Sequence, residues 1–249
     1  MQTTFPRLQN WHLALLIGVM VGWMSNAAHA QDSQDVLVHV SNMEKAAREI
    51  QDSTYVLYIQ TWDGDRLSVV EQVAVKYRRP NDVFLRWTGA IHAGRQVVYM
   101  PSSGETKMWV KTGTNLPGVA VDPKGPIAQR ASRHSVDEVG LVAAVDVITD
   151  DVNRATSSAR EKSHFTDLGR KEIHGTVTTC WSADLPKDDD PNFYAQRVEI
   201  CQDVDTNLPV RLTVWDDFGE GLRLVERFVF MDVQTNVGLT DADFDPRML

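Results

Sequence analysis

Residues 74–87 read AVKYRRPNDVFLRW, and this stretch decides how the chain folds. Apolar and polar residues alternate on both sides of its proline, which is typical of two β-strands joined by a tight turn. Three cationic side chains crowd the turn, and Trp87 closes the second strand. Neither an enzyme active site nor a plain β-sandwich needs this combination, so the interpretation depends on the rest of the chain.

The N-terminus resembles a secretory leader. Arg7 is its only charge, the apolar stretch LALLIGVMVGWM follows, and the small residues AHA precede Gln31. A basic start, an apolar centre too short to span a bilayer with ease and small residues at the end are typical of a signal peptide. We therefore predict a signal peptide over residues 1–30, cleaved after Ala30, and a soluble exported domain over 31–249. An uncleaved membrane anchor is the alternative.

The charge balance is acidic. The 249 residues carry a net charge of −9, with 25 basic and 34 acidic residues. This balance argues against a nucleic acid partner, because phosphate binding needs a basic patch. It also argues against broad adsorption to anionic lipid. The length suits one β-rich domain with a sizeable core.

Two cysteines, Cys180 and Cys201, fall in segments that predict a hairpin. The segments 173–184 and 195–204 both alternate like strands, and folding the chain between them places the cysteines opposite each other. We therefore predict a cross-strand disulfide on the solvent face of the hairpin, with two free thiols as the alternative. The same register pairs apolar residues on the opposite face: Val177 with Val204, Trp181 with Ile200 and Ala183 with Val198.

Apolar spacing predicts two helices. From Val36 to Ile50 apolar residues recur at intervals of three and four, which indicates an amphipathic helix. Residues 136–148 are apolar around most of the helical circumference, as in a helix buried on more than one side. The preceding segment, 112–135, contains several Gly and Pro residues and is predicted to be a long loop.

Strand patterns fill most of the remaining chain. They lie at 54–62, 67–79, 82–88, 94–100, 106–111, 208–216 and 221–233, in addition to the hairpin. We predict one α+β domain, in which a strongly curved antiparallel sheet of about nine or more strands forms an open half-barrel. The N-terminal helix and an apolar lid or plug helix complete it.

Several motifs are similar to those of known families. VKYRRPNDVFLRW resembles the K-R-P-x-x-F-x-W signature of the LolA-like superfamily, periplasmic carriers and sensors of lipidated or hydrophobic clients. The C-terminal stretch FVFMDVQTNVGLTDADFD is similar to the last strands of that superfamily. GRQVVYM, VDPKGPIA and SRHSVDEVGL resemble domain-of-unknown-function family 1571 more closely, although Ser135 and Asp137 replace its usual proline and threonine.

The resemblance implies a role for one arginine. In the carriers of the superfamily, the arginine of K-R-P hydrogen-bonds the lid helices and helps to control opening of the cavity, and the matching position is Arg79. An arginine at a strand end can donate five hydrogen bonds, and carbonyls at helix C-termini lack partners. The alternative is that Arg78 and Arg79 are solvated cations that blunt the end of a strand.

Catalytic motifs are missing from the sequence. It contains no G-x-S-x-G elbow, H-E-x-x-H helix, Walker loop or C-x-x-C pair. His134, next to Arg133 in the predicted loop, is the most interesting histidine, and a structural role within the loop is favoured over catalysis. We therefore expect no enzyme activity, no cofactor and no metal site.

Apolar area remains as the feature that can carry a function. We predict a cavity lined by Leu85, Trp87, Val97, Tyr99, Trp109, Trp181, Leu212, Val214 and Phe230. A lid is predicted from the loop and the second helix, at Arg133, His134, Val139, Leu141, Val142 and Val145. Burying an acyl chain there would contribute ~0.8 kcal/mol per methylene. Core packing is the alternative explanation for the tryptophans.

Two functions from different classes follow. The preferred one is a periplasmic binding protein, monomeric, that holds a lipid, a lipoprotein acyl chain or another hydrophobic client in the half-barrel. The alternative is an envelope sensor or assembly subunit that binds a protein partner through the same curved sheet.

Overall fold

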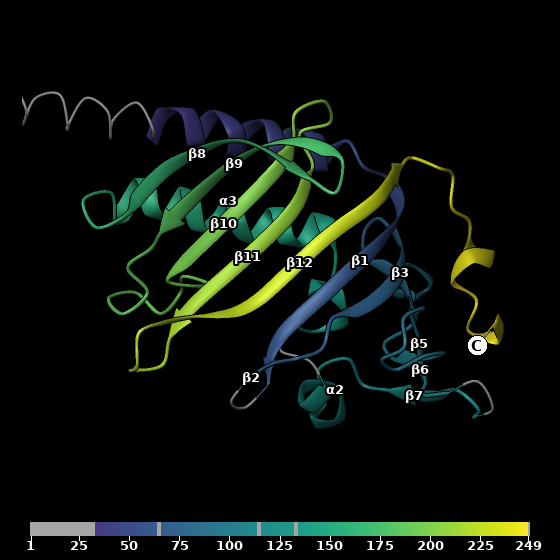
Figure 1. The fold of residues 1–249 in the computed structure, drawn as a ribbon. Helices are drawn as coiled ribbons and strands as arrows, with labels where there is room; N and C mark the ends of the chain where they lie inside the picture. The colour runs from purple at the N-terminus through teal and green to yellow at the C-terminus, as the bar shows by residue number, and fades with distance from the viewer. Residues whose placement is uncertain (1–32, 64–65, 114–115, 132–133, 249) are drawn as a thin grey trace, which may run out of the picture.

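The computed structural model describes residues 33–63, 66–113, 116–131 and 134–248 (Figure 1). The predicted signal peptide and Arg133 lie outside the described residues. Cleavage after Ala30 and the part of Arg133 in the lid therefore stay predictions.

Within the described residues, the chain forms one open antiparallel sheet of 12 strands (Figure 1). The strand order is β7-β6-β5-β4-β3-β1-β12-β11-β10-β9-β8, and β2 pairs with β1 beside this path. The predicted α+β class and open sheet are confirmed, and the domain is single. The strands are β1 (Asp52–Asp63), β2 (Arg66–Leu67), β3 (Glu71–Arg78), β4 (Asp82–Trp87), β5 (Gln96–Tyr99), β6 (Met108–Lys111), β7 (Val119–Val121), β8 (His164–Ile173), β9 (Thr176–Asp184), β10 (Arg197–Asp203), β11 (Pro209–Asp217) and β12 (Leu222–Thr235).

Two meanders meet at the pairing of the first long strand with the last. The strands β3 to β7 continue from one side of β1, whereas β11 to β8 continue from β12. Along β3 the inward residues Val73, Val75 and Tyr77 are buried and alternate with neighbours that are less buried. This alternation is the period-2 pattern of a sheet that buries one face.

Two helices cover one face of the sheet, which we call the helix-covered face (Figure 1). The N-terminal helix spans 33–48 and buries Val36, Val40, Met43 and Ala47, as its apolar spacing predicts. The second is α3 (Leu141–Ser158), which follows the short helices α2 (Pro126–Ala131) and η2 (Val136–Glu138).

The predicted boundaries of the second helix are wrong at both ends. Residues Val136–Glu138 form a separate 3-10 turn, and α3 begins only after Gly140, whose φ of 126° and ψ of 176° are not helical. The helix then continues to Ser158, because Val152 and Ala155 extend its buried stripe beyond Ile148. The predicted loop 112–135 also contains β7 and α2.

The strand β8 was not predicted, for a physical reason. It is an edge strand, and only Phe165 and Ile173 are buried along it. Apart from the partly buried Leu168, its other residues are polar side chains or Gly169, which removes the alternation that identifies a half-buried strand.

The core has two parts on the helix-covered face. The N-terminal helix and most of α3 pack on β9 to β12 in the first part. The first residues of α3, Leu141 and Val142, belong to the second part, with β1 and β3 to β6. The helix α3 therefore bridges both halves of the sheet.

The predicted disulfide between Cys180 and Cys201 is confirmed, as is its register. Its predicted solvent position is wrong, because both cysteines are 0 % exposed. They lie on the face opposite the helices, where Ile173, Val210 and Leu168 cover them. These covering residues come from β8 and β11, which the hairpin pattern alone does not include.

Candidate functional site

Most of the predicted lining residues share the helix-covered face. Leu85, Val97, Trp181, Leu212, Val214 and Phe230 are all buried within the two parts of the core. Trp87 and Tyr99 are half-buried at the edge of the second part. These side chains pack against the helices and one another, so a client could reach them only after a helix moves.

Trp109 does not share this face. Its neighbours Met108 and Val110 pack into the second part of the core, whereas Trp109 pairs with Val98 on the other face. The prediction that Trp109 lines the same surface is therefore wrong. Three consecutive apolar residues in β6 hid the direction of its alternation.

The start of α3 is fixed by a buried tyrosine. The N–H of Leu141 donates to the hydroxyl of Tyr55 at 3.1 Å, and burial raises the pKa of that hydroxyl above its usual range. A Cβ on Gly140 would lie only 2.7 Å from the same oxygen. Glycine is therefore required here both by its positive φ and by this close approach. Of the other predicted lid residues, Val145 packs in the first part of the core and Val139 borders the second.

The middle of α3 is tied to the connection between β9 and β10. The carboxylate of Asp151 accepts the N–H of Tyr194 at 3.0 and 3.3 Å. Burial raises the pKa of Asp151 to about 6, although the bond from Tyr194 and the charge of Arg154 act in the opposite direction. A movement of α3 would break this tie or carry the connection with it.

A buried carboxyl group gathers two further side chains. Glu226 on β12 is 0 % exposed, and its Oε1 lies 3.1 Å from Nε2 of His134. The hydroxyl of Tyr194 donates to its Oε2 and also lies 3.0 Å from Nε2 of His134. His134 thus reaches the sheet instead of bonding only within its own loop. We call Glu226, His134 and Tyr194 the carboxyl cluster.

Arg79 bonds carbonyls at the end of a helix, as the resemblance implies, but the helix is the N-terminal one. Its Nε donates to the carbonyl of Ile50 at 2.6 Å and its Nη2 to that of Ala47 at 2.9 Å. The alternative of a solvated cation is therefore wrong for Arg79. Its link to α3 is electrostatic: its charge lowers the pKa of Asp146, which burial raises overall. Control of opening by Arg79 stays a prediction.

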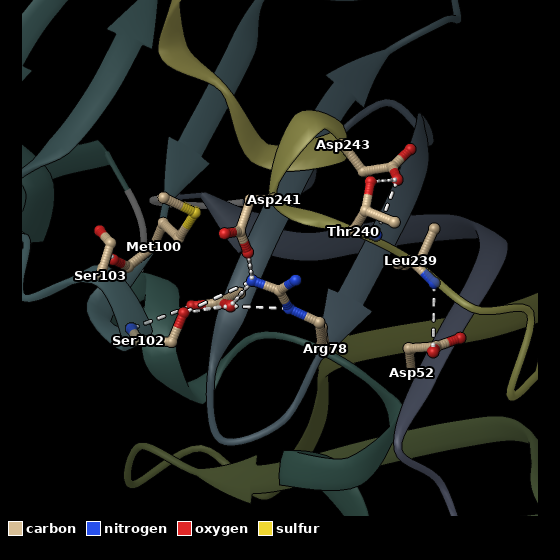
Figure 2. Close-up of polar contacts among 10 residues, drawn as sticks. Asp52, Arg78, Met100, Ser102, Ser103, Leu239, Thr240, Asp241 and Asp243 are labelled. Atoms are coloured by element: carbon tan, nitrogen blue, oxygen red, sulfur yellow. Dashed lines mark hydrogen bonds and ion pairs between the residues drawn. The ribbon is translucent and has the colours of Figure 1, made fainter.

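The adjacent arginine faces the other side and holds the C-terminal segment (Figure 2). Arg78 donates to Asp82 at 2.7 and 3.0 Å and to Asp241 at 2.8 Å. Its guanidinium lies 5.0 Å from the ring centroid of Phe244, which is 0 % exposed. The hydroxyl of Ser102 donates to the same buried Asp82 at 2.6 Å.

Lys76 and Asp52 complete the attachment of this segment. Lys76 donates to Asp243 at 2.7 Å, which is the main reason that the pKa of Asp243 falls to about 2. The carboxylate of Asp52 accepts backbone N–H groups from Val237, Gly238 and Leu239 at 2.7 to 3.2 Å. Figure 2 shows the bond from Leu239. Lys76 and Arg78 thus anchor the C-terminal segment, whereas Arg79 anchors the end of the N-terminal helix, which explains why the turn is crowded with charge.

The described residues contain neither a cluster of metal-binding side chains nor a helix suited to span a membrane. Among them, no three His, Cys, Asp or Glu side chains gather closely enough to hold a metal ion. No helix within the same ranges combines the length and apolar character that crossing a membrane would require.

The chain belongs to a family described as "Protein of unknown function (DUF1571)", whose model matches residues 50–248. The predicted membership of this family is confirmed. No curated protein matches the chain.

Solved structures with similar topology come from bacterial proteins. Lipoprotein LppX of Mycobacterium tuberculosis is 13% identical, with 85% of this chain and 99% of that chain covered and a TM-score of 0.49. The LolA superfamily protein NE2245 of Nitrosomonas europaea is 15% identical, with 84% and 98% covered and a TM-score of 0.39. MucB in the MucA/MucB complex of Pseudomonas aeruginosa gives 14% identity, 86% and 60% coverage and a TM-score of 0.43.

Proposed function

We propose that this chain is an exported, periplasmic binding protein that holds a hydrophobic client on the helix-covered face of its sheet. The client would be a lipid or the acyl chain of a lipidated protein. The observation that carries the proposal is the position of α3, whose apolar stripe bridges both parts of the core. If α3 moves away, one continuous apolar surface becomes available from β4 to β11.

The exchange of α3 for a client is reasonable in energy. The apolar face of the sheet would be covered by alkyl chain instead of by Val145, Ile148 and Val152, which are buried in α3. Each buried methylene contributes ~0.8 kcal/mol, so a long acyl chain can offset the loss of several such side chains. The proposal needs no catalytic group, cofactor or nucleic acid, and a monomer suffices.

The ends of α3 suit such a movement. Gly140 separates α3 from η2 and has the backbone freedom to act as a pivot. The polar ties of α3 that the described residues show are local, at Tyr55, at the backbone of Tyr194 and in a partly exposed ion pair of Arg154 with Asp190 at 3.8 Å. Breaking these ties costs a few hydrogen bonds and one partly exposed ion pair, whereas the strands stay paired.

Two measurements test the proposal. Native mass spectrometry of the protein purified from its own envelope is expected to show a non-covalent hydrophobic adduct. Hydrogen exchange with and without added dodecanol is expected to change in Leu141–Ser158 and to leave the 3-10 helix η3 (Asp241–Phe244) unchanged as the internal control, because η3 contacts Lys76 and Arg78 and not the helix-covered face. An empty protein that also fails to bind dodecanol, or binding that leaves α3 unaltered, would contradict the proposal.

A second function, the binding of a protein partner by an envelope sensor or assembly subunit, is favoured by one observation. Three large apolar side chains in the segment around β7 are well exposed: Leu116 at 55%, Val119 at 53% and Ile127 at 73%. Exposed apolar side chains that lie together often mark interaction surfaces. Pull-down from envelope extracts distinguishes the two functions, because a stoichiometric protein without lipid would favour the partner-binding function.

A further inference from the structure

A carboxyl group lies within the apolar helix-covered face. Glu226 lies in β12, where it is paired with Val214 of β11 on one side and with Thr61 of β1 on the other. Its side chain is 0 % exposed. The neighbouring position Val214 belongs to the first part of the core. Burying a carboxylate in such surroundings is costly unless hydrogen-bond donors or cations compensate it.

Two of the groups that bond its oxygens belong to segments connected to α3. His134 immediately precedes η2, which leads to α3 through Gly140. Tyr194 bonds Glu226 through its hydroxyl and Asp151 of α3 through its backbone N–H. If α3 lifts from the sheet, it carries these groups or loosens them. The carboxyl group would then face the newly exposed apolar surface with fewer donors.

We infer that Glu226 is the polar recognition group of the client site and that the client is an amphiphile with a protonated amine in its head. This inference rests on the proposed function. A cationic amine replaces the displaced hydrogen bonds and also neutralises the charge, and charge-assisted bonds are about twice as strong as neutral ones. A hydroxyl head supplies only the hydrogen bond, and a carboxylate head is repelled.

The experiment compares three amphiphiles with the same alkyl chain. Dodecylamine, dodecanol and dodecanoate are titrated into the protein below their aggregation concentrations, and binding is followed by calorimetry. Glu226→Gln removes the charge and keeps the side-chain shape. Glu105→Gln is the matched control, because Glu105 is exposed and its loss changes the net charge equally. Tyr194→Phe removes one competing donor and keeps the carboxyl group.

The wild type is expected to bind dodecylamine at least about tenfold more tightly than dodecanol, which corresponds to ~1.4 kcal/mol. The ratio should fall close to unity in Glu226→Gln, persist in Glu105→Gln and increase in Tyr194→Phe. If Glu226→Gln does not fold, the inference is tested by the ratio of dodecylamine to dodecanol affinity in the wild type and by its increase in Tyr194→Phe.

The outcomes separate the inference from the function on which it rests. Binding of all three amphiphiles without an amine preference overturns the inference and leaves the proposed function in place. A preference that survives in Glu226→Gln, or that disappears in Glu105→Gln, also overturns it. If no amphiphile binds at all, both the proposed function and the inference fail.

Discussion

The junction before α3 offers the sharpest test of the structure. Replacing Gly140 by alanine should loosen the start of the helix, because the new Cβ would lie 2.7 Å from the hydroxyl of Tyr55. Such a contact is too short for the two atoms to keep their places. The hydroxyl would have to leave the N–H of Leu141, which it now accepts at 3.1 Å.

The cost has two sources. The backbone of Gly140, at φ 126° and ψ 176°, lies in a region that is essentially restricted to glycine, and an alanine there costs about 1–3 kcal/mol. Loss of the bond between Leu141 and Tyr55 leaves a buried N–H unpaired, which costs another ~1–3 kcal/mol. We expect Gly140→Ala to lower the free energy of unfolding by about 2–6 kcal/mol.

Urea denaturation followed by tryptophan fluorescence measures this change, and Gly175→Ala is the control. Gly175 also has a positive φ, of 85°, but a Cβ there meets nothing within 4 Å. Gly175→Ala should lower the free energy of unfolding only by the conformational strain, about 1–2 kcal/mol.

A double-mutant cycle with Tyr55→Phe isolates the steric contact. The single variant Tyr55→Phe loses the hydrogen bond, at about 1–3 kcal/mol. When Tyr55→Phe is combined with Gly140→Ala, the free energy of unfolding should fall little further than in Gly140→Ala alone. The hydroxyl oxygen that clashes with the new Cβ is then absent, and its bond to Leu141 is already lost in Gly140→Ala. If the two costs simply add, or if Gly140→Ala is no worse than Gly175→Ala, the reasoning about this junction is refuted.

Two further predictions concern Arg79 and Asp151. Arg79→Leu removes two hydrogen bonds to helix-end carbonyls, so we expect the free energy of unfolding to fall by about 2–4 kcal/mol. Hydrogen exchange at residues 33–50 and client release should both become faster, and Arg79→Lys should restore them only in part. Unchanged hydrogen exchange would contradict this role of Arg79. The pKa of Asp151 is raised from 3.8 to about 6, so the folded protein binds this proton more tightly than the unfolded chain. The resulting stabilisation is complete below about pH 4 and is lost as the pH rises through about 6. Asp151→Asn still accepts the N–H of Tyr194 and serves as the reference. Between these pH limits the free energy of unfolding of the wild type should fall by up to about 2 kcal/mol relative to this variant. A difference in stability between the two proteins that does not change with pH would exclude a raised pKa.

Local patterns predicted those parts of the fold that depend on neighbouring residues. The hairpin of Cys180 and Cys201 is the clearest case, because alternation and cysteine pairing indicate one register, and that register is present. The N-terminal helix follows equally from its spacing. Where alternation was blurred by consecutive apolar residues, as around Trp109, the direction of the side chain could not be predicted.

The residues that hold α3 escaped prediction because their partners are distant in the chain. In the sequence, Tyr55 is one of several aromatic residues in a strand pattern, and Glu226 is a polar residue among apolar ones. A charged residue at a position that faces the core in the strand LRLVERFVF was the available signal for Glu226. Its significance appears only when His134, 92 positions away, is placed beside it.

Alternation, helical spacing and paired cysteines by themselves determined that this chain forms a bent antiparallel sheet with two apolar helices. These signals are local, since each arises from residues that share one strand, one helix face or one hairpin. Only the tertiary structure decided that Lys76 and Arg78 anchor the C-terminal segment while Arg79 anchors the end of the N-terminal helix. It also decided that the disulfide is buried and that a carboxyl group lies on the helix-covered face. Such pairings depend on which strands become neighbours in the sheet. Residues that are far apart in the sequence and become neighbours produce no periodic pattern from which their contact could be predicted.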